Sequence, residues 1–185
     1  MKLPPQFYLV IAFIFLVSCT SSEIPPKSQS DPSRLQVVSV DQKTKIAMGQ
    51  TIYVPVYSHI YYQNQEKVLN LAATLSIRNT DFNQPMIITS VDYYDSNGKV
   101  IRQFLARPVQ LGAMASTDFV VDSTDTSGGS GANFIVEWIA QTEISKPIVE
   151  AVMIGTESNR GISFVSAGKV IKTQPSSGGD QQKLR

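Results

Sequence analysis

The sequence predicts an all-β protein, an immunoglobulin-like antiparallel β-sandwich, with a small β-barrel as the alternative. Several short segments alternate apolar and polar residues at a period of two, the pattern of strands that bury one face. Beyond the N-terminal segment, no stretch keeps an apolar period of 3.6, so helical crossovers are not expected. Turn-favouring residues separate the segments at short intervals, as in sandwiches and barrels.

The clearest strand pattern spans residues 68–78, where every second residue from Leu69 to Ile77 is apolar and the residues between are mostly polar. A slip of one residue would expose the whole apolar row, so this register should be well determined. The segments expected to form strands are Thr51–Tyr57, Val68–Arg78, Ile87–Tyr93, Lys99–Leu105, Ser116–Val121, Asn133–Ala140, Pro147–Ile154 and Gly161–Val165.

Two of these strands are expected to form a hairpin. In Ile87–Tyr93 every second residue is expected to face the core, and Asp95–Gly98 then leads into the next strand. Asn97 and Gly98 both tolerate a positive φ, which predicts a type I′ turn. The strands on either side should be antiparallel neighbours.

Trp138 is expected to be a core residue on a central strand. It shares a period-two face with Phe134, Val136 and Ala140, while Glu137 falls on the other face. A ligand platform is the alternative for an exposed tryptophan, but an aromatic ring within an apolar row more often packs in a core.

The chain length accommodates one domain, because globular domains usually have about 100 to 150 residues. We expect the β-sandwich domain at residues 50–168, with two N-terminal segments before it at 1–18 and 19–49 and a disordered tail after it at 169–185. Ser- and Pro-rich segments at both ends are too poor in apolar residues to offset the entropy of ordering.

The charge balance argues against a nucleic-acid partner. There are 16 Lys and Arg residues and 15 Asp and Glu residues, with no basic stripe. Neutralisation of phosphates by basic residues supplies much of the affinity of nucleic-acid-binding proteins. We therefore expect no nucleic acid among the partners.

The N-terminus has the features of an export signal. Lys2 is followed by the apolar run Phe7–Val17, which is too short to cross a bilayer that needs about 20 residues. The run ends in Leu16-Val17-Ser18-Cys19, which resembles the lipobox of bacterial lipoproteins. That resemblance implies a signal peptide at residues 1–18, cleavage between Ser18 and Cys19, and lipid attachment to the Cys19 thiol at the start of a flexible tether over 19–49. An ordinary secretory signal and an uncleaved signal anchor are the alternatives.

A single cysteine and a single histidine limit the chemistry. One cysteine forms no intramolecular disulfide, and one Cys with one His does not complete a zinc site. His59 is the weak metal-ligand candidate, and with Tyr57 and Tyr61 at period-two spacing it marks a possible binding face. No metal or other cofactor is expected.

No catalytic residues are expected either, so the chain is not predicted to be an enzyme. Gly128–Ala132 departs from the Gly-x-Ser-x-Gly pattern at Ala132 and lacks the helix that follows a nucleophile elbow. Asp118, Asp122 and Asp125 do not have the spacing of an EF-hand loop. The segment from Asp122 to Ala132 is expected to be a long flexible hairpin loop.

Four short segments together resemble a family of uncharacterised bacterial lipoproteins with a domain of unknown function. They are Tyr53–Tyr61, Leu75–Thr80, Val91–Asp95 and Phe134–Trp138. The likeness covers roughly Gln50–Thr156. It implies an all-β domain displayed on a lipid anchor, and it supplies no catalytic residue.

These observations lead to two hypotheses for function. The first is a membrane-anchored, non-enzymatic binding or accessory module of the cell envelope, facing the periplasm or the exterior. Its partners would be the membrane, through the lipid anchor, and an envelope protein that the sequence does not identify. The alternative is an envelope lipoprotein that binds a small ligand or metal with His59 and the neighbouring tyrosines.

Overall fold

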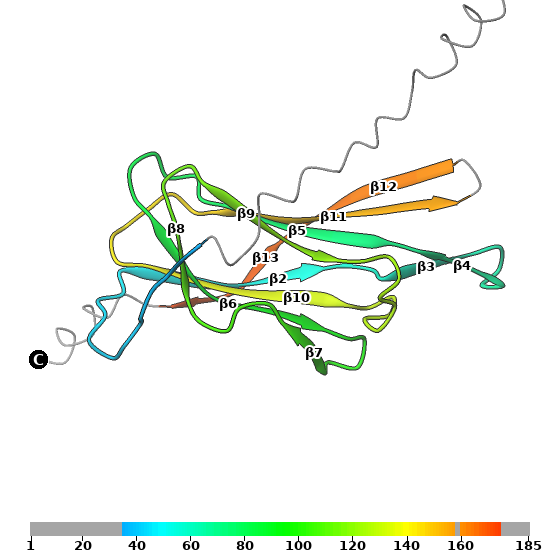
Figure 1. The fold of residues 1–185 in the computed structure, drawn as a ribbon, viewed down its shortest axis with the longest axis horizontal. Coiled ribbons are helices and arrows are strands. Elements are labelled where there is room, and N and C mark those ends of the chain that lie inside the picture. The colour runs from blue at the N-terminus through cyan, green and yellow to red at the C-terminus, as the bar shows by residue number, and fades with distance from the viewer. Residues whose placement is uncertain (1–34, 158–159, 175–185) are drawn as a thin grey trace, which may run out of the picture.

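The computed structural model describes residues 35–157 and 160–174, which form two antiparallel sheets packed against one another (Figure 1). The strands are β1 Gln36–Val37, β2 Met48–Pro55, β3 His59–Tyr62, β4 Lys67–Asn70, β5 Ala72–Arg78, β6 Met86–Tyr94, β7 Val100–Gln103, β8 Val109–Leu111, β9 Ser116–Val121, β10 Asn133–Ala140, β11 Ile148–Glu157, β12 Arg160–Ala167 and β13 Lys169–Gln174.

The larger sheet has seven strands and the smaller has four. The larger runs β1-β8-β6-β10-β2-β13, with β7 also paired to β6, and the smaller runs β12-β11-β5-β9. A separate β3–β4 hairpin connects β2 of one sheet to β5 of the other. Every pairing between described strands is antiparallel, and the two sheets do not join into a barrel. The predicted sandwich is confirmed.

The core lies between the sheets and is built from the inward rows that the sequence pattern predicts. From β10, the side chains of Phe134, Val136, Trp138 and Ala140 are all buried. They belong to one apolar cluster with residues of the smaller sheet, including Leu75 of β5. The prediction that Trp138 is a core residue on a central strand is therefore confirmed.

Strand β6 departs from the predicted alternation. The pairing with β10 shifts between Glu137 and Trp138, so that Thr89 has no partner on β10 and forms a bulge. An extra residue reverses which side chains face inward. Ile88 is therefore fully buried before the bulge, and the inward row resumes at Val91. The expectation that Ile87 and Thr89 share a face with Val91 is wrong for this reason.

The predicted β6–β7 hairpin forms, but its turn is of another type. Gly98 has φ of +80°, whereas Asn97 is not among the residues with positive φ, so the type I′ prediction is wrong. The Asp95 carboxylate accepts hydrogen bonds from the backbone N–H of Asn97 and of Lys99, both at 2.9 Å. These bonds lower the pKa of Asp95, the bond from Lys99 contributing most. Because the Asp95 side chain accepts these two N–H groups, the loop is stabilised in a conformation other than the two-residue type I′ turn.

The predicted strand over residues 68–78 is divided at Leu71 into β4 and β5. The N–H of Leu71 donates to the Ser58 carbonyl at 2.9 Å, where the chain leaves the β3–β4 hairpin for the smaller sheet. The alternation continues across the break, because Leu71 is itself fully buried. A continuous apolar row therefore does not reveal that two different sheets use its two parts.

The tail boundary at residue 169 is also wrong, since β13 occupies 169–174 and pairs with β2. Gly168 makes this possible. A Cβ at Gly168 would lie 2.6 Å from Ile52 Cγ2 and 2.7 Å from the Val149 carbonyl oxygen, so only glycine lets the chain cross from β12 to the larger sheet. The low apolar content of the segment conceals an edge strand held mainly by backbone pairing.

The expected signal peptide, the lipobox and the first part of the tether, up to residue 34, lie outside the described residues, as does the tail beyond residue 174. The tether boundary at residue 49 is wrong, because β1 already pairs with β8 at Gln36–Val37 and β2 begins at Met48. Within the described part of the chain, no helix has the length and apolar character that crossing a bilayer requires.

We predict that Trp138→Ala will lower the free energy of unfolding by about 3 to 5 kcal/mol, because it removes a fully buried ring and leaves a cavity. Chemical denaturation of wild type and variant measures this change. Native wild-type tryptophan emission should be blue-shifted, because the Trp138 ring is buried and is the single tryptophan that reports. Red-shifted emission open to a soluble quencher would contradict the buried placement.

Candidate functional site

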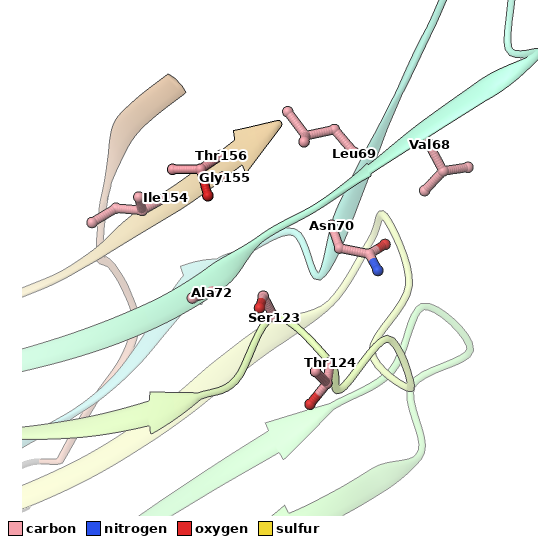
Figure 2. Close-up of a pocket in the computed structure, with 9 residues that line it drawn as sticks. All are labelled: Val68, Leu69, Asn70, Ala72, Ser123, Thr124, Ile154, Gly155 and Thr156. Atoms are coloured by element: carbon pink, nitrogen blue, oxygen red, sulfur yellow. The ribbon is translucent and has the colours of Figure 1, made fainter. Parts of the chain in front are cut away.

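One end of the sandwich contains a cavity of about 400 Å³ between the β3–β4 hairpin, the end of β11 and the start of the β9–β10 loop (Figure 2). None of its lining residues is charged. The lining residues are Val68, Leu69, Asn70, Ala72, Ser123, Thr124, Ile154, Gly155 and Thr156. Amide and hydroxyl groups therefore stand beside aliphatic ones, a composition suited to an uncharged partner.

Gly155 lets β11 approach the hairpin closely enough to form one wall of the cavity. A Cβ at Gly155 would lie 2.6 Å from Leu71 Cδ2 and 3.0 Å from the Asn70 carbonyl oxygen. Neither the buried leucine nor the backbone is free to retreat by the distance a methyl group needs. Glycine at this point of a strand therefore has a packing role.

His59 and Tyr61 lie on the same face of the hairpin as two cavity residues. In the antiparallel register His59 is opposite Asn70 and Tyr61 is opposite Val68, and opposed residues point to the same side. The rings of His59 and Tyr61 meet edge to face with centroids 5.1 Å apart. Their Nε2 and Oη atoms are 3.2 Å apart, so the pair forms an amphipathic patch beside the cavity.

Ser58 anchors this pair to the β9–β10 loop. Its buried hydroxyl is 3.1 Å from the Gly129 carbonyl oxygen and 3.3 Å from that of Thr126, and 3.3 Å from His59 Nδ1. A hydroxyl has one proton, which the carbonyl oxygens require. In the tautomer with the proton on Nδ1, the Ser58 oxygen accepts from His59 and Nε2 accepts from the Tyr61 hydroxyl. The two contacts orient the imidazole from both sides.

Tyr57 lies elsewhere. It is outside both neighbouring strands, and its ring packs against Phe164 of β12 with centroids 6.0 Å apart. The chain turns between β2 and β3, where the N–H groups of Val56 and Ser58 donate to the carbonyls of Ala132 and Gly129. The structure thus brings together His59 and Tyr61 and does not bring Tyr57 to them.

The β9–β10 loop, expected to be flexible, is held from two sides. Ser58 binds it on one side, as described above. On the other side, the N–H and the hydroxyl of Ser96 both donate to the Gly128 carbonyl at 3.0 Å, while the Ser96 oxygen accepts from Gly131 N–H at 2.9 Å. Arg102 of β7 forms an ion pair with Asp125 at 2.6 Å. Residues distant in sequence supply these bonds, so the loop's glycine-rich composition does not reveal them.

The acidic residues of this loop are engaged by the loop itself. Asp122 accepts from the N–H and hydroxyl of Thr124, and the Thr124 N–H contributes most to its lowered pKa. Asp125 accepts from Ser127, whose hydroxyl contributes most to the lowered pKa of Asp125. Across the described residues, no group of three or more His, Cys, Asp or Glu side chains is arranged to hold a metal ion.

A buried phenol lies beneath the same loop. The Tyr93 hydroxyl has no hydrogen-bond partner among the described residues, and a Cβ at Gly128 would overlap it. Burial, the largest cause, raises the pKa of Tyr93 to about 12, with Asp125 adding to the rise and Arg102 opposing it. Gly128 is therefore required for the loop to close over this ring.

Sequence reasoning identified His59 and Tyr61, which lie opposite two cavity residues, but did not identify the residues that line the cavity. Asn70, Ser123 and Thr156 come from three separate parts of the chain, and none belongs to a motif. Gly155 within an otherwise apolar strand is the one local signal, because an interior glycine often marks a close approach.

The fold and this site define the class of protein as an antiparallel β-sandwich domain with a small polar and apolar cavity at one end. The model of the family described as protein of unknown function (DUF3124) matches residues 49–171, and the chain belongs to this family. No curated protein matches the chain.

Among solved structures, the chain is similar to one described as the crystal structure of Thermotoga maritima 1070. The identity is 12% and the TM-score 0.42, over 65% of this chain and 92% of that one.

We predict that Tyr93→Phe will leave the free energy of unfolding unchanged at neutral pH or raise it by about 1 kcal/mol, because it removes a buried, unpartnered hydroxyl. The folded-state pKa of Tyr93 exceeds its ordinary value of 10.0, so the unfolded chain loses this proton first. Wild type should therefore lose stability between pH 10 and about 12 through this residue, and the variant should not.

Denaturant titrations at several alkaline pH values measure this difference, with Tyr94→Phe on the neighbouring position as the matched control. Equal losses in wild type and Tyr93→Phe would contradict the assignment.

Proposed function

We propose that this chain is a lipid-anchored, non-enzymatic binding module of the bacterial cell envelope that engages an uncharged partner at the hairpin end. The observation that carries the proposal is the cavity beside the His59–Tyr61 pair, assembled from the β3–β4 hairpin, the β11 end and the β9–β10 loop. Sites that join a few polar groups to an apolar wall favour binding without needing charge.

The lipid anchor rests on the N-terminal sequence. Cys19 is the single cysteine, and it follows an apolar run at the spacing of a lipobox. A lipid there would hold the domain to a membrane, since each buried CH₂ contributes about 0.8 kcal/mol and several acyl chains bind durably. The domain would then face the periplasm or the exterior.

A non-enzymatic role is supported by the bonding of the residues that resemble catalytic ones. The Ser58 hydroxyl donates its hydrogen bond to loop carbonyls, and His59 is oriented by Ser58 and Tyr61. Ser130 lies in a loop that joins strands β9 and β10, whereas a nucleophile elbow joins a strand to a helix. These groups act in our proposal as supports for a binding surface.

We predict that a photo-crosslinking amino acid at Tyr61 will capture a partner in the native host, whereas the same group at Val120 will not. Tyr61 is half exposed beside the cavity, while Val120 is similarly exposed on the outer face of β9. Immunoblotting of the crosslinked products measures both. Adding Asn70→Ala should weaken capture at Tyr61, because Asn70 lies opposite His59 and lines the cavity.

Capture should change little between low and high salt, because none of the side chains that line the cavity is charged. Equal capture at Tyr61 and Val120 would contradict the hairpin-end site. Capture that disappears as salt is raised would contradict an uncharged partner.

We predict that Cys19→Ser will abolish acylation, because the chain has no other thiol to take the lipid. Metabolic labelling with palmitate measures it, and Ser22→Ala is the matched control that should label normally. Continued incorporation by Cys19→Ser would remove the basis for the anchor.

A further inference from the structure

Two large apolar side chains are exposed at the end of the sandwich opposite the β3–β4 hairpin. Phe82, in the β5–β6 loop, is 78% exposed, the highest value among large apolar side chains of the described residues, and Met114 is 57% exposed. The Met114 N–H donates to the carbonyl of Asp81 at 3.0 Å, which joins the two loops next to Phe82. We refer to Phe82 and Met114 as the apolar tip.

The loops that carry the apolar tip are fixed in place. The Asp81 carboxylate accepts hydrogen bonds at 2.9 to 3.0 Å from the N–H groups of Asn83, Gln84 and Ser145. These bonds lower the pKa of Asp81, the bond from Asn83 contributing most.

The buried Asn79 amide joins the same loops from below. Its nitrogen donates to the carbonyls of Gln84, Leu111 and Gly112. Phe82 is therefore exposed on a loop that hydrogen bonds hold in one conformation.

Met114 is unusual in conformation as well as in exposure. Its φ is +56°, in the left-handed region that favours glycine or asparagine. Neither the backbone conformation nor the exposed position of Met114 favours methionine, since a glycine or a small polar residue would fit better in both respects. Uncommon conformations that the surroundings maintain often mark functional positions.

The chain enters the domain at this same end. Strand β1 pairs antiparallel with β8, with Gln36 opposite Gln110 and Val37 opposite Val109. Moving toward the N-terminus along β1 therefore follows β8 toward Gly112 and Met114. Figure 1 shows β8 at one end of the sandwich and the β3–β4 hairpin at the other.

From these observations we infer that the apolar tip inserts into the surface of the membrane that holds the lipid on Cys19. The inference rests on the lipid anchor of the proposed function. The segment of residues 20–34 spans at most about 50 Å, so an anchored Cys19 confines the domain to that distance from the bilayer. Because the chain enters at the end that carries the apolar tip, this end is the one joined directly to the anchor.

Two side chains alone bind a bilayer weakly, but a tether that raises their local concentration makes the second contact effectively intramolecular. The orientation has a consequence for the hairpin end. With the apolar tip in the lipid, the cavity beside His59 and Tyr61 faces away from the membrane, where an envelope partner has access to it.

The test uses the full chain, processed in a lipoprotein-producing bacterium and reconstituted in vesicles of phosphatidylethanolamine and phosphatidylglycerol. A polarity-sensitive dye is attached through Asn83→Cys, beside Phe82, or through Glu66→Cys in the β3–β4 turn as the matched control. Once the Cys19 sulfur carries lipid, the introduced cysteine is the single reactive thiol. Both positions are exposed, so neither change removes a core contact.

We expect the dye at position 83 to shift to the blue and to be quenched by nitroxide groups on the lipid chains, and the dye at position 66 to stay aqueous. Phe82→Ser with Met114→Ser should abolish both signals at position 83 without loss of fold, since both side chains are exposed.

An aqueous dye at position 83 in a chain that incorporates palmitate and stays on vesicles would overturn the insertion and leave the anchor intact. Equal quenching at positions 83 and 66 would overturn the upright orientation. A blue shift without lipid quenching would assign the apolar tip to a protein contact and overturn the inference. Absence of palmitate would overturn the anchor and the insertion together.

Discussion

The structure depends on the inward side chains of one strand, β10, which pack against the smaller sheet. β10 lies near the centre of the seven-stranded sheet, and its inward side chains Phe134, Val136 and Trp138 are completely buried. An aromatic ring buries about 150 to 250 Å², and each Å² contributes about 25 cal/mol, so Trp138 alone stabilises the core by about 4 to 6 kcal/mol. The bulge at Thr89 preserves this packing, because it lets β6 keep Ile88 opposite Trp138 and still turn Val91 inward.

With the core formed, the two ends of the sandwich are shaped by small polar side chains that bind backbone groups. Ser58 and Ser96 hold the β9–β10 loop beside the cavity, while Asn79 and Asp81 hold the loops of the apolar tip. Buried or partly buried hydrogen bonds of this kind satisfy loop backbone that no strand pairs with. Loops fixed in this way present the same surface to a partner each time, which lowers the entropy lost on binding.

The two ends suggest a division of roles along one axis. The apolar tip and the entry of the chain through β1 are at one end. The β3–β4 hairpin, with the uncharged cavity beside it, is at the other (Figures 1 and 2). A domain held by a lipid and by its tip would present the cavity at a defined height and orientation. Family membership adds no activity to this picture, because a fold does not determine a function.

The sequence by itself determined the all-β class, most strand positions and the buried face of β10, while the export signal that it predicts lies outside the described residues. These follow from local patterns, because alternation, turn residues and apolar runs act over a few neighbours. The tertiary structure alone decided that Leu71 separates two strands, that Thr89 reverses a face, that Tyr57 packs on Phe164 away from His59, and that β13 pairs with β2. Each of these features depends on contacts between residues distant in the chain. The approach of β11 to Leu71 that Gly155 permits is one example, and no local sequence pattern identifies such a contact.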